Sequence, residues 1–224
     1  MSLLVDGFKE AIELLISGND SVYSAIIVTI TVSSWSILIS LILGLPLGFL
    51  LGYYQFKGKT VIKTIVDTFL AFPTVVIGLL VYTTLSQAGA FGEYNLLFTQ
   101  KAIIIGQIFL GLPIIIALTA AQVESTDKRL YLSLKGLGAK PYQILLTTLV
   151  EARFGLMTAA MTAYGRIITE IGISMMVGGN IKYHTRTITT AISLETGKGE
   201  FETGIALGLV LFIVALMVNI ALSM

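Results

Sequence analysis

The stretch LYLSLKGLGAKPYQILLTTLVEARFG, residues 130–155, decides the fold because it is a polar island between strongly apolar segments. Gly138 supplies a helix stop and Pro141 suits the first turn of a following helix. The preceding leucines share one helical face: Leu130, Leu134 and Leu137. The spacing therefore predicts a helix, a turn and a helix over 128–154. Both helices are too short and too charged to cross a bilayer, so we expect them at the membrane surface or in water, where a partner protein could bind them. The alternative is an ordinary connecting loop.

The composition places the rest of the chain in lipid. Of the 224 residues, 55% are hydrophobic and 12% charged, and the mean hydropathy is +0.91, far from the values of soluble domains. A net charge of +1 without a basic run argues against nucleic-acid binding. Zero cysteines exclude disulfides and thiolate metal sites, and His184 alone cannot form a histidine metal site.

Charge-poor apolar stretches predict an all-α polytopic membrane protein with five core transmembrane helices. Residues 1–20 precede them as an amphipathic helix that lies along the membrane surface or against the bundle. A single transmembrane domain then covers 21–224. The predicted spans run over about 24–52, 64–87, 102–123, 156–180 and 203–224.

Small residues and prolines inside these spans predict close packing and bends. Gly44, Gly48 and Gly52 are four residues apart and line one helix face, which lets two backbones approach closely in lipid. Pro73 and Pro113 each remove a backbone hydrogen bond; Pro73 permits a bend or a break, and Pro113 permits a bend. A static kink for packing and a moving hinge both remain open for these prolines.

The fourth predicted span carries charge deep in the membrane. Arg166 and Glu170 are four residues apart and can pair on one face. Unpaired charges at this depth are expensive, so the two interpretations are a buried pair that fixes the fold and an arginine that lines a path for an anion. Thr169 and Ser174 either line the same path or bond back to their own helix. Asn180 either belongs to the path or caps a helix end.

The segment 181–202 is polar and contains His184, Arg186 and a run of threonine hydroxyls that includes Thr187. One interpretation is a solvated loop on which a soluble binding protein docks without the loop touching cargo. The other is a contribution to the pathway, since arginine and hydroxyl donors can replace the hydration of an anion.

Lysine and arginine gather in two predicted loops, and cytoplasmic loops are the ones that carry this excess. We therefore predict that both loops face the cytoplasm, that the N-terminus lies outside and that the C-terminus lies inside. The two loops hold eight of the fourteen basic residues: Lys57, Lys59 and Lys63 in the first, and Lys128, Arg129, Lys135, Lys140 and Arg153 in the second.

Leu137-Gly138-Ala139, followed by LVEAR at 149–153, resembles the cytoplasmic coupling motif of ABC importer permeases. Val150 stands where that family usually has proline, and residues 132–134 occupy the Glu-Ala-Ala positions of the motif. The resemblance implies a docking surface for a separate ATPase. Its residues are Leu132, Ser133, Leu134, Gly136, Leu137, Gly138, Ala139, Lys140 and Pro141.

A second stretch, GRIITEIGISMMVGGNI at 165–181 with HTRTITTAI at 184–192, resembles molybdate, sulfate and phosphate permeases and is most similar to tungstate-type permeases. The resemblance implies a type I (MetI-like) ABC importer permease in the plasma membrane that works by alternating access. Tungstate is the first candidate cargo, and molybdate, sulfate or phosphate are alternatives. The residues implied for the pathway or the buried pair are Arg166, Thr169, Glu170, Ser174, Asn180, Arg186 and Thr187.

The chain contains no Gly-x-x-x-x-Gly-Lys-Ser/Thr phosphate loop, so ATP and Mg²⁺ are expected on a partner ATPase, with no cofactor or metal in this chain. The resemblance implies a second copy of the chain, two ATPase subunits, an extracytoplasmic binding protein, lipid and an oxyanion as partners. Two other classes remain as alternatives. One is an intramembrane enzyme that uses Glu170 with Asp67 or His184, and the other is a channel or carrier that needs no ATPase.

Overall fold

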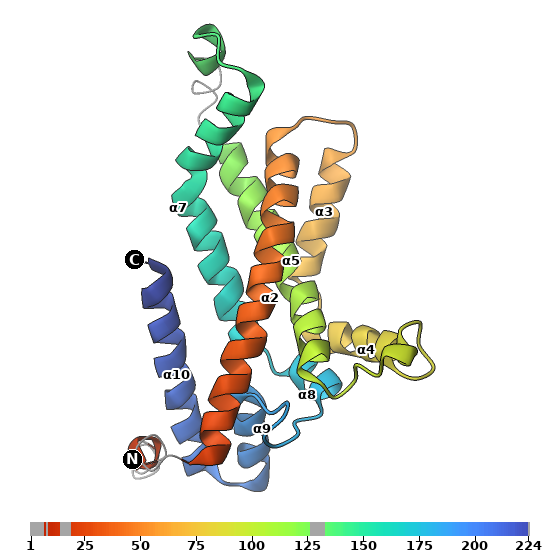
Figure 1. The fold of residues 1–224 in the computed structure, drawn as a ribbon, viewed down its shortest axis with the longest axis vertical. Helices are drawn as coiled ribbons and strands as arrows, with labels where there is room; N and C mark the ends of the chain where they lie inside the picture. Colours follow the sequence, from red (N-terminus) through yellow and green to blue (C-terminus); the bar gives the residue numbers. More distant parts are fainter. Residues whose placement is uncertain (1–6, 8, 14–18, 126–132, 224) are drawn as a thin grey trace.

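Long helices lie side by side in the computed structural model, which describes residues 7, 9–13, 19–125 and 133–223 (Figure 1). Every regular element within those residues is helical. In chain order they are α2 (Asp20–Tyr53), α3 (Lys59–Leu70), α4 (Thr74–Leu85), the 3-10 helix η1 (Gly92–Tyr94), α5 (Gln100–Ser125), α7 (Pro141–Ile168), α8 (Gly172–Gly178), α9 (Ile188–Lys198) and α10 (Phe201–Ser223).

Four of these helices, α2, α5, α7 and α10, are long and apolar enough to cross a membrane. The predicted span over 64–87 is not one straight helix, because the structure divides it into α3 and α4, which meet at an angle of 97°. Pro73 causes the break: it lacks a donor, and it disfavours helical backbone at the residue before it. It stands at the N-cap of α4 with φ −61° and ψ 125°. Taken together, the two helices of the bent pair are long and apolar enough for a fifth span.

The other predicted bend does not interrupt its helix. Pro113 lies inside α5, which continues from residue 100 to residue 125. The missing hydrogen bond therefore does not end the helix. Membrane helices tolerate such prolines when neighbouring helices satisfy the freed backbone carbonyl.

The predicted fourth span, 156–180, also needs correction. One helix, α7, runs from Pro141 to Ile168, so the second predicted coupling helix is the first part of the spanning helix. The chain then breaks at 169–171 and continues as the short helix α8. The break has a local cause, since the Glu170 carboxylate accepts a hydrogen bond from the Ile173 amide at 3.2 Å and satisfies a free donor in the first turn of α8.

The residues described within the predicted N-terminal helix pack against the start of α10. Residues 9–13 are helical, and Glu10 accepts a hydrogen bond from the Thr203 hydroxyl at 2.7 Å. A Cβ atom on Gly7 would lie 2.8 Å from Ile205 Cγ2. These contacts favour a position against the bundle. The remaining residues of the predicted helix lie outside the described part.

Two apolar cores hold the bundle together, and both lie in the lower half of Figure 1. The first surrounds Ile103 and Ile173, where α4, α5 and α8 meet the beginning of α2. The second surrounds Ile168, Ile188 and Val210, where α2, α7, α9 and α10 meet. The best-packed part of the bundle is therefore the end away from the start of α7.

The glycine ridge of α2 packs against α5 as the four-residue spacing predicts. A Cβ atom on Gly48 would lie 2.7 Å from the Ile116 carbonyl oxygen, and one on Gly52 would lie 2.7 Å from the Ala120 carbonyl oxygen. A Cβ on Gly44 would lie 2.8 Å from the Ile115 side chain. The two helix backbones therefore touch along this ridge, and any side chain there would push them apart.

We expect Gly48→Ala to lower the thermal unfolding midpoint of the purified protein in detergent. Overpacking costs about 1–3 kcal/mol, which exceeds the roughly 1 kcal/mol that alanine gains over glycine as a helix former. Gly208→Ala in α10 is the matched control, because a Cβ there meets nothing within 4 Å. Its midpoint should stay the same or rise, and an equal fall in both variants would contradict the role of the ridge in packing.

Candidate functional site

The functional candidates lie at opposite ends of the bundle. The end of α2 and the starts of α3 and α7 stand at the top of Figure 1, whereas α4, α8 and α9 lie at the bottom. The described coupling residues predicted from the sequence, 133–141, belong to the first end. Arg166, Glu170 and the threonine-rich segment belong to the second, so α7 connects the two regions.

A tight turn at Gly138 leads into α7. Residues 133–136 are helical, and Gly138 has φ +77°, a conformation that favours glycine. The Gly138 amide donates to the Lys135 carbonyl at 3.1 Å, and the Ala139 amide donates to the Leu134 carbonyl at 3.0 Å. This pair of bonds is the Schellman arrangement that ends helices. The turn of the predicted helix-turn-helix therefore lies at Gly138, as the sequence predicts. Leu132 and residues 128–131 lie outside the described residues.

The turn passes directly into α7 at Pro141, the first helical residue. The Lys140 amide donates to the Gln143 side chain at 2.7 Å, which satisfies one donor at the helix start. The apex of the turn is open to its surroundings: the Leu137 side chain is 84% exposed, and Ser133 and Gly136 are exposed beside it. An apolar side chain on a projecting turn is a surface that a partner can cover.

Three charged side chains join α3 to α5 at the same end of the bundle as this turn. Glu124, near the end of α5, contacts Lys59 Nζ at 2.9 Å and Lys63 Nζ at 2.6 Å. Lys59 also donates to the carbonyls of Gly52 and Tyr54, each at 3.1 Å. From the sequence, these lysines indicate only the orientation of the chain, and Glu124 carries no signal of its own. The pairing joins residues 61 positions apart, which no local spacing rule reveals.

At the opposite end, Arg166 and Glu170 form an asymmetric ion pair. Arg166 Nη1 lies 3.2 Å from Glu170 Oε2; the Glu170 side chain is 2% exposed and the Arg166 side chain 45% exposed. The carboxylate is thus buried and tied to α8, while much of the guanidinium remains accessible. The burial of Glu170 agrees with a pair that fixes the fold, and the exposure of Arg166 agrees with an arginine that lines a path for an anion. The two sequence interpretations are therefore compatible.

The threonines of the polar segment lie in the interior, so its interpretation as a solvated loop is wrong for them. The buried members are Thr185, Thr187, Thr189 and Thr190. Thr187 caps α9 by accepting from the Thr190 amide, and the Thr189 hydroxyl donates to the Glu170 carbonyl at 3.0 Å. The Ile188 amide donates to the Thr29 hydroxyl of α2 at 2.9 Å. The cluster joins α2, α9 and the break after α7.

The remaining predicted pathway residues differ in accessibility. Thr169 is exposed, and its hydroxyl bonds back to the Gly165 carbonyl at 2.9 Å. Ser174 is fully buried and donates to the Glu170 carbonyl at 3.4 Å. Asn180, at φ +50°, accepts a hydrogen bond from Arg186 Nε at 3.1 Å. Arg166 and Thr169 are exposed, Asn180 and Arg186 are half-buried, and Ser174, Glu170 and Thr187 face inward.

Residues 44–224 match the family model described as "Binding-protein-dependent transport system inner membrane component". The chain belongs to this family. It is 52% identical to the tungstate uptake system permease protein TupB of Campylobacter jejuni, over 98% of this chain and 92% of that protein. TupB of Peptoclostridium acidaminophilum is 35% identical over 98% of this chain and 96% of its own length.

A molybdenum transport system permease, ModB of Azotobacter vinelandii, is 27% identical over 84% of this chain and 88% of that protein. Among solved structures, a chain of the MetNI methionine ABC transporter superposes with a TM-score of 0.74 at 20% identity. The match covers 91% of this chain and 93% of that chain. This inner-membrane component is therefore a multi-pass helical membrane protein with the fold of ABC importer permeases, as the sequence predicts.

A buried glutamine in this inner-membrane component escaped the sequence analysis. Gln107 of α5 is 2% exposed, accepts a hydrogen bond from Ser36 of α2 at 2.9 Å and donates to the Ile167 carbonyl of α7 at 3.5 Å. It joins three spanning helices. A lone amide in the middle of an apolar span was the available signal, because such a group needs a partner inside the bundle.

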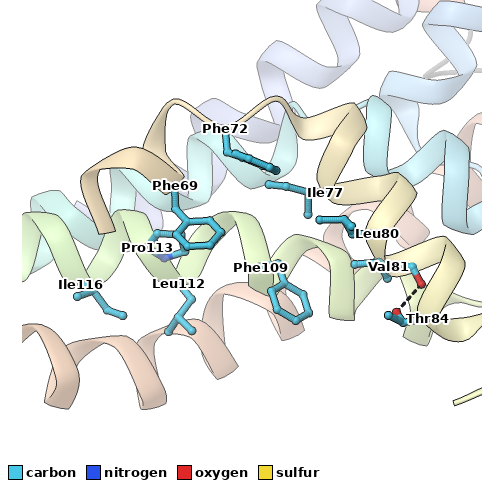
Figure 2. A pocket seen from close by; sticks show the side chains of 10 residues that line it. All are labelled: Phe69, Phe72, Ile77, Leu80, Val81, Thr84, Phe109, Leu112, Pro113 and Ile116. Carbon is cyan, nitrogen blue, oxygen red and sulfur yellow. Dashed lines mark hydrogen bonds between the residues drawn. The ribbon is translucent and has the colours of Figure 1, made fainter. Parts of the chain in front are cut away.

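The bent pair α3 and α4 forms an apolar groove of about 420 Å³ against α5. Figure 2 shows Phe69 and Phe72 on one side of it and Phe109 and Pro113 on the other. The Thr84 hydroxyl, the one polar side-chain group that lines the groove, donates to the Val81 carbonyl at 2.9 Å. Such a surface cannot replace the hydration of an anion, so the groove is unsuited to an oxyanion.

Proposed function

We propose that this chain is the membrane-spanning subunit of an ATP-driven importer of oxyanions, with tungstate as the cargo. Two relatives that match 98% of the chain are named tungstate uptake permeases, at 52% and 35% identity, whereas the molybdenum permease stands at 27%. Molybdate is the alternative cargo because it is also a tetrahedral dianion. Sulfate or phosphate is the more distant alternative.

The observation that carries the mechanism is the projecting turn at Gly138 joined directly to α7. This helix has 28 residues without a break, about 42 Å at 1.5 Å per residue. Arg166 lies near its far end. A push on the turn by an ATPase therefore moves Arg166 without any intervening hinge, and the bundle alternates between inward-open and outward-open states.

The partners follow from this mechanism. One five-span chain leaves the accessible side of Arg166 uncovered, so we propose that two copies face one another around a shared pathway. Two ATPase subunits bind ATP and Mg²⁺ beneath the turns, and an extracytoplasmic binding protein delivers the oxyanion. This chain then transports without catalysing a reaction and holds no cofactor.

The proposed orientation places the turn in the cytoplasm, the N-terminus outside and the C-terminus inside. The support is geometric: the connection from α2 to α3, which holds Lys57, and the first turns of α3, which hold Lys59 and Lys63, lie at the same end of the bundle as the turn (Figure 1). Two basic regions far apart in sequence therefore lie at one end of the bundle, which supports a cytoplasmic position for that end.

The test uses the complete transporter, reconstituted with its ATPase and its binding protein in proteoliposomes. Tungstate, molybdate, sulfate and phosphate are offered separately, and ATP hydrolysis and uptake are measured. We expect tungstate to stimulate both at the lowest concentration. If molybdate, sulfate or phosphate does so instead, the cargo is misassigned, and no stimulation by any oxyanion would contradict an oxyanion importer.

A further inference from the structure

From Thr158 onward α7 exposes polar side chains, whereas the part before it exposes large apolar ones, such as Phe154, which is 66% exposed. Thr158, Thr162, Arg166 and Thr169 are all exposed, and their spacing places them in one stripe along the helix. The middle of α10 exposes large apolar side chains instead, such as Phe212, which is 65% exposed. Of the four intact spanning helices, α7 is also the least buried and the least apolar.

A polar stripe on a spanning helix cannot face lipid at low cost. The hydroxyls of Thr158 and Thr169 bond back to carbonyls of their own helix, at 3.0 and 2.9 Å, which reduces the cost for these two side chains. The Arg166 guanidinium cannot be satisfied in this way, because its partner Glu170 leaves its side chain 45% exposed. Charged groups in a membrane face the bundle interior or a water-filled cavity. The stripe therefore faces water or protein.

The stripe ends in a recess of about 410 Å³ between α5 and α7, toward the basic end of the bundle. Its polar lining comes from Gln122, Ser125, Thr158 and Thr162. A smaller recess of about 170 Å³ on the α3 side of α5 shares Ala121 with it. The two recesses are thus neighbours across one strip of α5, in the half of the bundle that lies away from the two apolar cores.

We propose that the stripe Thr158, Thr162, Arg166 and Thr169 is one wall of the translocation pathway and that the recess beside Thr158 is its cytoplasmic exit. This inference rests on the proposed function for the identity of the cargo. From Thr158 to Thr169 the stripe advances by eleven residues, about 17 Å of helix at 1.5 Å per residue. It runs from Arg166 toward the end of the bundle that carries the coupling turn and stops at Thr158.

The distribution of charge along this wall suits release of an anion. Arg166 lies at the outer part of the stripe and offers charge-assisted hydrogen bonds. Among the described residues that line the recess there is no lysine or arginine. Hydroxyl and amide groups at the exit can solvate an oxyanion, but they hold it more weakly than a cation would. Conduction requires binding weak enough for the cargo to leave.

The absence of cysteine from the sequence makes the inference directly testable. In the complete transporter in proteoliposomes, Thr162→Cys introduces a single thiol in this chain, and Phe212→Cys is the control on the exposed apolar face of α10. The probe is a membrane-impermeant, anionic methanethiosulfonate. Such a reagent needs the thiolate, which forms in water and not in lipid. We expect Thr162→Cys to react at least about tenfold faster than the control and to lose uptake on modification.

Two results would overturn the assignment. One is equally slow modification of Thr162→Cys and Phe212→Cys. The other is spontaneous disulfide formation between two copies of Thr162→Cys without reaction with the reagent, which would show a dry contact between subunits. Labelling is measured without oxyanion, so it is independent of the cargo. Fast labelling without tungstate-stimulated ATP hydrolysis would support the pathway and contradict the proposed cargo.

A second pair of variants tests the hydroxyl itself and separates its role from folding. Thr162→Ser keeps the hydroxyl, whereas Thr162→Val keeps the shape. We expect Thr162→Val to lower the uptake rate by about two- to tenfold, the effect of one lost hydrogen bond, and Thr162→Ser to retain it. Both proteins should have the same unfolding midpoint. Equal uptake by the two variants would exclude a contribution of the hydroxyl to transport.

Discussion

Replacing Gly138 by proline should uncouple ATP hydrolysis from uptake. Gly138 has φ +77°, whereas the proline ring fixes φ near −65°, and the substitution also removes the amide that donates to the Lys135 carbonyl. A proline in an incompatible position costs about 3 kcal/mol or more, so the native turn becomes roughly 100-fold less populated. We expect coupled uptake to fall by a similar factor while α7 remains folded. The measurement is oxyanion uptake per ATP hydrolysed in the complete transporter.

Gly199→Pro provides a control with matched strain at the other end of the bundle. Gly199 has φ +90°, its amide donates to the Thr196 carbonyl at 3.1 Å, and a Cβ there meets nothing within 4 Å, as at Gly138. Its replacement should lower the unfolding midpoint and leave the ratio of uptake to hydrolysis unchanged. Normal coupling in Gly138→Pro, or equal uncoupling in both variants, would rule out a special role for the Gly138 turn.

The turn at Gly138 could be predicted because short-range rules determine it. A glycine stop and a proline at the first helical position need no knowledge of the rest of the chain. The apolar stretches likewise predict α2, α5 and α10 within a few residues at each end. Lipid compatibility is a property of composition, so a window of charge-free residues detects it.

Windows of charge-free residues could not predict the break between α7 and α8, the angle between α3 and α4, or the burial of the threonines near Thr187. Pro73 marks a possible bend or break between α3 and α4, but a charge-free window carries no information on direction and so does not give the 97° angle. The threonines near Thr187 look like a solvated loop because their partners are distant: Thr29, which accepts from Ile188, is 159 positions away. The Glu124 pairing with Lys63 spans 61 positions. Long-range contacts of this kind decide burial, and composition alone does not contain them.

Arg166→Gln should destabilise the protein more than Glu170→Gln, although both remove one charge of the same pair. With Arg166 gone, the Glu170 carboxylate stays buried, its side chain 2% exposed, without its cation. Breaking a buried pair costs about 3–5 kcal/mol. Because the Arg166 side chain is 45% exposed, we expect about 2–3 kcal/mol here, or roughly 5–10 °C in the unfolding midpoint. Glu170→Gln keeps an oxygen for the Ile173 amide and leaves Arg166 partly accessible, so its loss should be smaller.

The double variant Arg166→Gln with Glu170→Gln separates the structural role of the pair from a role in transport. Two neutral amides leave no buried charge, so the unfolding midpoint should return to within a few degrees of the original protein. If Arg166 lines the pathway, uptake should nevertheless remain about tenfold or more below normal, because a lost charge-assisted hydrogen bond is worth about 1.5–3 kcal/mol. Uptake that recovers together with stability would assign Arg166 to the fold alone and remove it from the pathway wall.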